Sequence, residues 1–298
     1  MTWTEWQTVE SEELAFSDIV YEKKYHSRLW GGQARITINR PERYNAFTEG
    51  TQDELFRAFY DASHDKRMGV VVLTGAGDHF GAGGDIEWEQ WAMREMFWRR
   101  YTLDRLVRMC RKPVIAMVRG LCIGASNHLA YCCDFTIAAD NAVFGQNGPR
   151  VSSPADGFIL PYLVRVVGAK KAREIWMLCR RYSASEALDM GLVNTVVALP
   201  HLEAEVDKWC EEILSLSPGC VEILKASFDA EIDTMPEIGL MSNWLYHDWF
   251  DSPEGREGAQ AFLAKRKPAH WRIRKAEVEA WEDAKQEVEK AQRELADE

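Results

Sequence analysis

The chain has 298 residues, a hydrophobic content of 46% and a formal net charge of −11. This acidic balance argues against broad binding to nucleic acid or to an anionic membrane surface. The sequence has no apolar run of 18 residues and no N-terminal stretch like a signal peptide, so we expect a cytoplasmic protein without a membrane partner. The seven cysteines form no CxxC pair, which predicts buried thiols in a reducing compartment and no metal site.

The first third of the chain alternates strand and helix patterns. Residues 1–16 are polar and predict a loose arm. Alternating residues at 19–25 and 33–40 predict a hairpin that ends at Pro41. A helix is expected at 48–64.

Two glycine-dense turns follow buried strands and lead into helices. The first turn spans residues 75–85 after a strand at 70–74, and the second spans 119–126 after a strand at 113–118. Glycine lets the backbone approach another molecule closely and present an N–H group to it. If the two strands are neighbours, two N–H groups can converge and stabilise an enolate or a tetrahedral oxyanion.

Strand–turn–helix units continue after the second turn. They predict right-handed crossovers and a largely parallel sheet, and therefore an α/β fold. The elements expected there are a strand at 134–138, helices near 161–167, 170–178 and 185–190, and a strand at 193–198. We expect a core at 17–200, a helical region at 201–272 and a charged helical tail at 273–298.

The order of these segments resembles the crotonase (enoyl-CoA hydratase/isomerase) superfamily over about residues 19–271. The matching segments are 39–47, 80–85, 112–116, 120–126 and 133–138. Further segments are similar to the branch that holds 1,4-dihydroxy-2-naphthoyl-CoA synthase and 2-ketocyclohexanecarboxyl-CoA hydrolase, namely 145–151, 169–182, 187–194 and 257–268.

The resemblance implies a spiral core of ββα turns with a helical C-terminal trimerisation region, in a homotrimer or a dimer of trimers. It implies an acyl-CoA thioester as substrate, with coenzyme A as part of that substrate and no separate cofactor. The thioester oxygen would accept hydrogen bonds from the N–H groups of Gly84 and Ala125. Coenzyme A would contact the adenine loop at Ala82 and, through its phosphates, Arg43 and a neighbouring subunit's Lys265 and Lys267.

Departures from the family pattern bear on the reaction. Hydratases use two glutamates, and the corresponding positions here are His128 and Gly148, which removes the acid–base pair for adding water to an enoyl-CoA. The branch aspartate aligns with Ala155, one residue before Asp156, and the synthase tyrosine aligns with Phe250. His128 and Asp156 are the two candidate bases, with a buried core histidine and a turn aspartate as the plainer interpretations.

Aromatic residues after the first glycine turn indicate the shape of the substrate. Trp88 and Trp91 lie in the helix that borders the acyl pocket in the family, and their flat side chains suit a cyclic or aromatic acyl group. Ordinary helix packing is the alternative. Asn147, in the turn before residue 148, is a further candidate for substrate binding.

The sequence thus predicts a hydrolase that opens the ring of a cyclic β-oxoacyl-CoA by retro-Claisen C–C cleavage. The alternatives are a Dieckmann-type cyclase like the naphthoyl-CoA synthases, and an acyl-CoA-binding relative with a reduced acid–base set. An enolate held in the oxyanion hole is common to the first two.

Overall fold

A mixed seven-stranded sheet forms the centre of the protein. The computed structural model describes residues 2–11, 14–89, 103–154, 157–230 and 252–296. In spatial order the strands are β1 (Gln7–Thr8), β2 (Ile19–Tyr25), β3 (Gly32–Ile38), β4 (Met68–Gly75), β5 (Val114–Val118), β7 (Phe135–Ala139) and β10 (Thr195–Val197). From β3 to β10 all neighbours are parallel, whereas β1, β2 and β3 pair antiparallel.

The N-terminal segment corrects one expectation and confirms another. The hairpin predicted before Pro41 is present as β2 and β3. The loose arm predicted for residues 1–16 is wrong in part, because Gln7–Thr8 forms an edge strand on β2 and Trp3 bridges to His26. The ring of Trp3 stands edge-on to His26 at 5.1 Å between centroids, so aromatic packing helps to hold this polar segment on the sheet.

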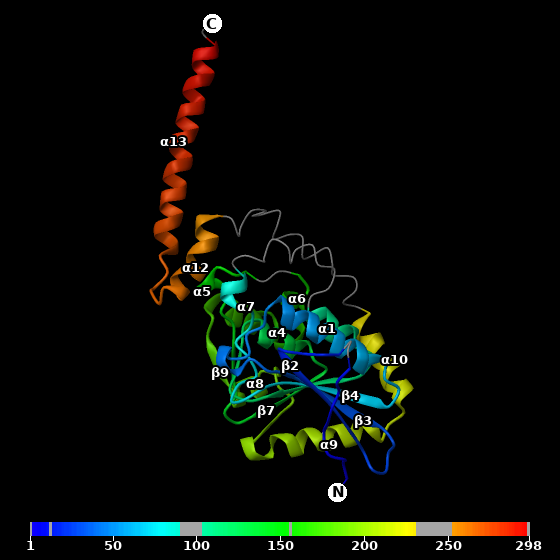
Figure 1. Ribbon diagram of the computed structural model, residues 1–298. Helices are drawn as coiled ribbons and strands as arrows, with labels where there is room; N and C mark the ends of the chain where they lie inside the picture. Colours follow the sequence, from blue (N-terminus) through cyan, green and yellow to red (C-terminus); the bar gives the residue numbers. More distant parts are fainter. Residues whose placement is uncertain (1, 12–13, 90–102, 155–156, 231–251, 297–298) are drawn as a thin grey trace.

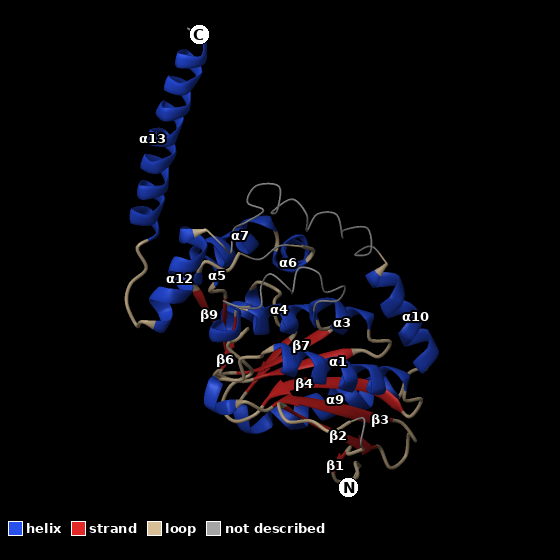
Figure 2. Cartoon of the chain, turned by 45° about the horizontal axis from the view of Figure 1, so that its top comes forward, coloured by secondary structure: helices blue, strands red, loops and turns tan. Residues whose placement is uncertain are grey.

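Helices cover both faces of the sheet (Figures 1 and 2). On one face lie α1 (Glu49–His64), α3 (Leu103–Met109) and α4 (Ala125–Cys132), and on the other lies α9 (Leu202–Leu214). Side chains along β4 alternate between two cores, as a strand buried on both faces requires. Val71 and Leu73 join the first core and Val70 and Val72 the second.

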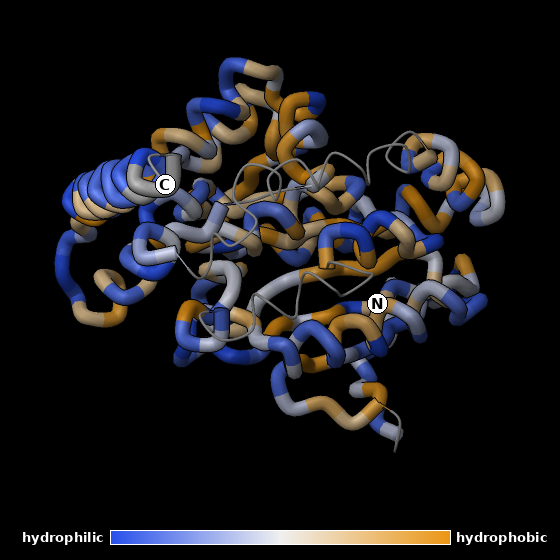
Figure 3. The backbone as a smooth tube through the Cα atoms, turned by 90° about the horizontal axis from the view of Figure 1, so that it is seen from above, coloured by the Kyte–Doolittle hydropathy of each residue, from blue (hydrophilic) through white to orange (hydrophobic). Residues whose placement is uncertain are grey.

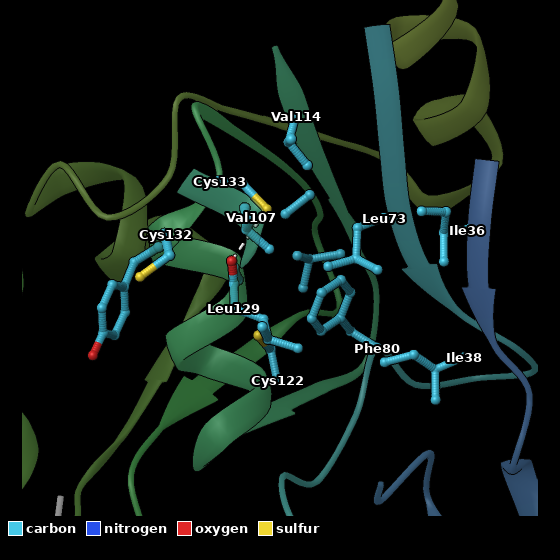
Figure 4. Packing of buried hydrophobic residues seen from close by; sticks show 14 of the residues in the cluster. Ile36, Ile38, Leu73, Phe80, Val107, Val114, Cys122, Leu129, Cys132 and Cys133 are labelled. Atoms are coloured by element: carbon cyan, nitrogen blue, oxygen red, sulfur yellow. Dashed lines mark hydrogen bonds between the residues drawn. The ribbon is translucent and has the colours of Figure 1, made fainter. Parts of the chain in front are cut away.

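The first core brings the strands and α4 together. Figure 4 shows Phe80, from the first glycine turn, packed between Leu73 and Leu129. Six of the seven cysteines are buried free thiols and Cys220 is exposed, so the expectation of buried thiols holds for six. Burial raises the pKa of Cys133 above its usual range, which keeps that thiol protonated.

The structure also contains a three-stranded sheet, which is linked to the first glycine turn by a bridge between Gly81 and Cys122. This sheet contains β6 (Leu121–Ile123), β8 (Val143–Gly145) and β9 (Arg181–Ser183). Further short helices of the described chain are η1 (Pro41–Arg43), α5 (Gly148–Val151), α6 (Ile159–Val167), α7 (Ala169–Leu178), α8 (Ala184–Asp189) and η2 (Leu199–His201), and α8 packs on β8 and β9. The helices expected near 161–167, 170–178 and 185–190 are confirmed.

The C-terminal region is helical, with α10 (Pro218–Asp229), α12 (Pro253–Leu263) and α13 (His270–Ala296). In α10, Lys225 Nζ lies 2.6 Å from Asp134 Oδ2 and anchors the helix to the core. The hydrophilic α13 projects from the body (Figures 1 and 3), and the boundary expected at 272/273 falls inside this helix. No helix in the described ranges is long and apolar enough to cross a membrane.

Candidate active site

The two glycine-rich turns lie side by side because their strands, β4 and β5, are parallel neighbours. Gly81 N donates to Leu121 O at 2.8 Å, and Ile123 N donates to Gly81 O at 3.0 Å. At Gly83, where φ is +99°, a Cβ would stand 2.9 Å from Ala125 N. Glycine at this position is therefore required both by the backbone conformation and by the close approach of the second turn.

The predicted oxyanion-hole donors face one cavity. Gly84 and Ala125 both line it, and among the described residues neither backbone N–H donates a hydrogen bond. Ala125 is the first residue of α4, where helix geometry leaves the N–H unpaired. Gly84 is held between two backbone hydrogen bonds, Phe47 N to Gly83 O and Asp85 N to Phe47 O, each 3.0 Å long. The arrangement can supply two backbone donors to one oxygen atom.

The cavity measures about 270 Å³ and is walled mainly by apolar and aromatic side chains. Phe47 comes from the segment that bridges to Gly84, and Trp88 follows the first glycine turn in the sequence. Phe158 directly precedes α6, and Trp176 lies in α7. Ala82 and Asn147 also line it. This size and lining suit a compact cyclic acyl group.

His128 is the fourth residue of α4, and it lines the cavity. Its ring centroid lies 5.1 Å from that of Trp176, and its Nε2 has no hydrogen-bond partner among the described residues. Burial lowers the pKa of His128 to about 4, and the nearby Gln146 side chain opposes this shift. The imidazole is therefore neutral at neutral pH and can accept a proton.

Gly148, the second position expected to differ from hydratases, has no room for a side chain. A Cβ there would lie 2.5 Å from Ser153 O and 3.3 Å from the Trp176 ring. Ser153 N donates to Gly148 O at 3.0 Å, so the turn closes tightly over this residue. A glutamate could occupy position 148 only if this turn moved.

We therefore expect Gly148→Ala to lower the free energy of unfolding by about 1–3 kcal/mol, the usual cost of overpacking. Denaturant unfolding measures the change. Gly219→Ala is the matched control, because a Cβ at Gly219, in the first turn of α10, would meet no atom of the described residues within 4 Å. Unchanged stability of the Gly148 variant would show that the turn does have room for a side chain.

Two half-buried carboxyl groups that line the cavity were missed by the sequence analysis. Glu89 lies five residues after Gly84, and Asp104 is the second residue of α3. Burial raises the pKa of Glu89 to about 7, with the Asp85 carboxylate adding to the rise, and burial raises the pKa of Asp104 to about 7 as well. The sequence could have indicated Glu89 as a candidate, because it lies between Trp88 and Trp91 and aromatic neighbours predict an environment with little water.

The remaining predicted site residues fall into three groups. Trp88, Ala82 and Asn147 line the cavity, and the Oδ1 atom of Asn147 accepts a hydrogen bond of 2.5 Å from Arg181. Residues that do not line it are the exposed Arg43, which lies 3.4 Å from Glu87, and the exposed Lys265 and Lys267 after α12. Residues outside the described ranges are Asp156, Trp91, Ala155 and Phe250.

Comparisons with known proteins agree with this architecture. A family model described as Enoyl-CoA hydratase/isomerase matches residues 31–273. An enoyl-CoA hydratase/carnithine racemase from Magnetospirillum magneticum is 32% identical, with 86% of this chain and 96% of that chain covered and a TM-score of 0.67. An enoyl-CoA hydratase/isomerase from Xanthobacter autotrophicus Py2 is 29% identical, with 86% and 100% covered and a TM-score of 0.67.

A third similar structure is a monofunctional enoyl CoA isomerase from M. smegmatis, 29% identical, with 72% of this chain and 94% of that chain covered and a TM-score of 0.59. The chain belongs to the enoyl-CoA hydratase/isomerase (crotonase) family. The expected crotonase fold, with a central sheet and C-terminal helices, is confirmed. The protein is thus an acyl-CoA-processing enzyme of this family.

Proposed function

We propose that this enzyme hydrolyses a C–C bond in the ring of a cyclic β-oxoacyl-CoA. The observation that carries the proposal is His128, a neutral imidazole that lines the cavity at a position where a hydratase is expected to carry a glutamate. Its Nε2 has no hydrogen-bond partner in the part of the chain that the structure describes. The closed turn at Gly148 supports it, because the second hydratase carboxylate is also missing. A site without that pair is poorly equipped to hydrate an enoyl-CoA.

In the proposed reaction the thioester oxygen accepts hydrogen bonds from Gly84 and Ala125. His128 or Asp156 takes a proton from water, and the resulting hydroxide adds to the ring ketone. The C–C bond between the former ketone carbon and the α-carbon then breaks. Its electron pair stays with the α-carbon, which forms an enolate whose oxygen is stabilised by the two N–H groups. A proton added to the α-carbon completes an open-chain dicarboxylic mono-CoA thioester, so one water is consumed per turnover.

Coenzyme A would extend from the cavity past Ala82. Arg43, Lys265 and Lys267 are the proposed phosphate contacts, the two lysines reaching a neighbouring subunit's site in a homotrimer or dimer of trimers. Their exposure supports this role, since all three cations are accessible to a ligand. Nucleic acid and membrane are not proposed partners, and the proposed location is the cytoplasm.

The proposal is tested by incubating the enzyme with 2-oxocyclohexane-1-carbonyl-CoA in ¹⁸O-labelled water and identifying the products by mass. We expect a diacid mono-thioester that has gained one water, with the label in the new carboxyl group. Parallel incubations contain the open-chain diacid thioester and an unsaturated 2-enoyl-CoA. Ring formation from the open chain would favour a Dieckmann cyclase, and hydration of the enoyl-CoA would favour a hydratase. Tight binding without any conversion would favour a binding protein, and each of these results would overturn the proposal.

A further inference from the structure

The cavity holds a second kind of proton-transferring group on the side of the first glycine turn. Glu89 lines the cavity, and its carboxyl oxygen Oε1 occupies the space where a Cβ on residue 84 would stand. The carboxyl group therefore lies directly against the α-carbon of Gly84. Because residue 84 has no side chain, the carboxyl group and the backbone N–H of the same residue share one corner of the cavity.

This placement matters for the α-carbon of a bound thioester. The N–H of Gly84 is a proposed donor to the thioester oxygen, and the α-carbon is one bond from the carbonyl carbon that carries this oxygen. We propose that Glu89 is the acid–base residue that exchanges a proton with the α-carbon of the acyl group. This inference deepens the proposed function and rests on its acyl-CoA binding mode, whereas it does not require ring cleavage.

The proton balance is complete in both directions. In ring opening, the protonated Glu89 gives its proton to the α-carbon of the enolate and is left as a carboxylate. In the reverse sense, the carboxylate removes the α-proton, the C–H electron pair forms a double bond to the carbonyl carbon, and the carbonyl π pair moves to the thioester oxygen, which gives the enolate. Water then reloads or deprotonates the carboxyl group, and no other reactant is needed.

The surroundings of Glu89 favour proton transfer at neutral pH. Among the described residues, the titratable groups near it are Asp85, which precedes it by four residues, and Asp104 and His128, which line the same cavity. Asp85 lies 3.5 Å from Arg40. Since burial and Asp85 raise the pKa of Glu89 to about 7, both its acid and its base forms are populated near neutral pH.

The test is α-proton exchange in a saturated thioester, cyclohexanecarbonyl-CoA, which has no ring ketone and cannot undergo the proposed cleavage. In D₂O we expect the enzyme to incorporate deuterium at the α-carbon, with a rate that rises with pH to a plateau above about 7, because the carboxylate is the active form. Glu89→Gln should slow exchange about 10²–10⁴-fold and abolish the pH dependence. The binding constant for the thioester and the melting temperature should change little.

Matched variants separate Glu89 from its neighbours. Glu87→Gln, two residues away and exposed, should leave exchange unchanged. Gly84→Ala keeps the backbone N–H but places a methyl group where the Glu89 carboxyl lies, so it should also slow exchange. This second variant tests the position of the carboxyl group even if Glu89→Gln folds poorly.

Three results would overturn the inference: no exchange by the unaltered enzyme, unchanged exchange in Glu89→Gln, or loss of the pH dependence in Asp104→Asn instead. Exchange that depends on Glu89 without any ring opening would uphold the inference and reject the C–C hydrolase. The two proposals can therefore fail independently.

Discussion

Ala125→Pro is expected to reduce kcat for thioester turnover by about 10²–10³-fold, the usual cost of losing one oxyanion-hole donor. Proline removes the backbone N–H that lines the cavity and replaces it with a ring carbon. Ala125 is the first residue of α4, a position where proline is well tolerated because the helix does not use that N–H. Steady-state kinetics with the cyclic β-oxoacyl-CoA measure the loss.

Ala125→Gly is the matched control for this substitution. Glycine retains the N–H, so we expect turnover close to that of the unaltered enzyme, with a small loss of helix stability. Melting curves of both variants show whether the helix still forms. An active Ala125→Pro enzyme would mean that this N–H does not hold the thioester oxygen.

His128→Gln is expected to reduce ring-opening turnover by about 10²–10⁴-fold, because glutamine cannot take a proton from water. It should leave α-proton exchange in the saturated thioester largely intact, since that step does not use the ring ketone. The rate of ring opening by the unaltered enzyme should fall as the pH drops through about 4, where His128 becomes protonated. Rates are measured from pH 3.5 upward, together with a spectroscopic check at each pH that the enzyme is folded, and they show whether activity falls near pH 4.

Asp156→Asn is the comparison that decides between the two candidate bases. If His128 activates water, the asparagine variant keeps most of its activity. If Asp156 does so, this variant binds the thioester and loses turnover, while His128→Gln stays active.

The free energy of unfolding, measured as a function of pH, checks that His128 is neutral in the folded state. Its folded pKa lies below the unfolded one, so its burial costs up to about 3 kcal/mol of stability as pH falls from 6.5 to 4. His128→Gln should lack this contribution.

Much of the fold could be predicted from local patterns. Apolar runs such as residues 70–74 and 113–118 predict strands buried on both faces. The first run lies within β4, and the second forms β5 except for its first residue, Pro113. The helix expected at 48–64 is α1, with Thr48 as its N-cap. The edge strand at Gln7–Thr8 could not be predicted, because a two-residue polar segment has no periodicity and gains its order from the sheet beside it.

The sequence by itself determined the family and the two glycine turns, and it predicts that His128 and Gly148 stand at the positions of the hydratase glutamates. These follow from residue identity and order along one chain. Only the tertiary structure decided that Glu89 lies against Gly84 and that a side chain at position 148 would clash with the backbone. It also decided that His128 Nε2 has no hydrogen-bond partner within the described part of the chain. Burial and contact across distant segments produce those properties, because desolvation and close approach depend on everything packed around a residue.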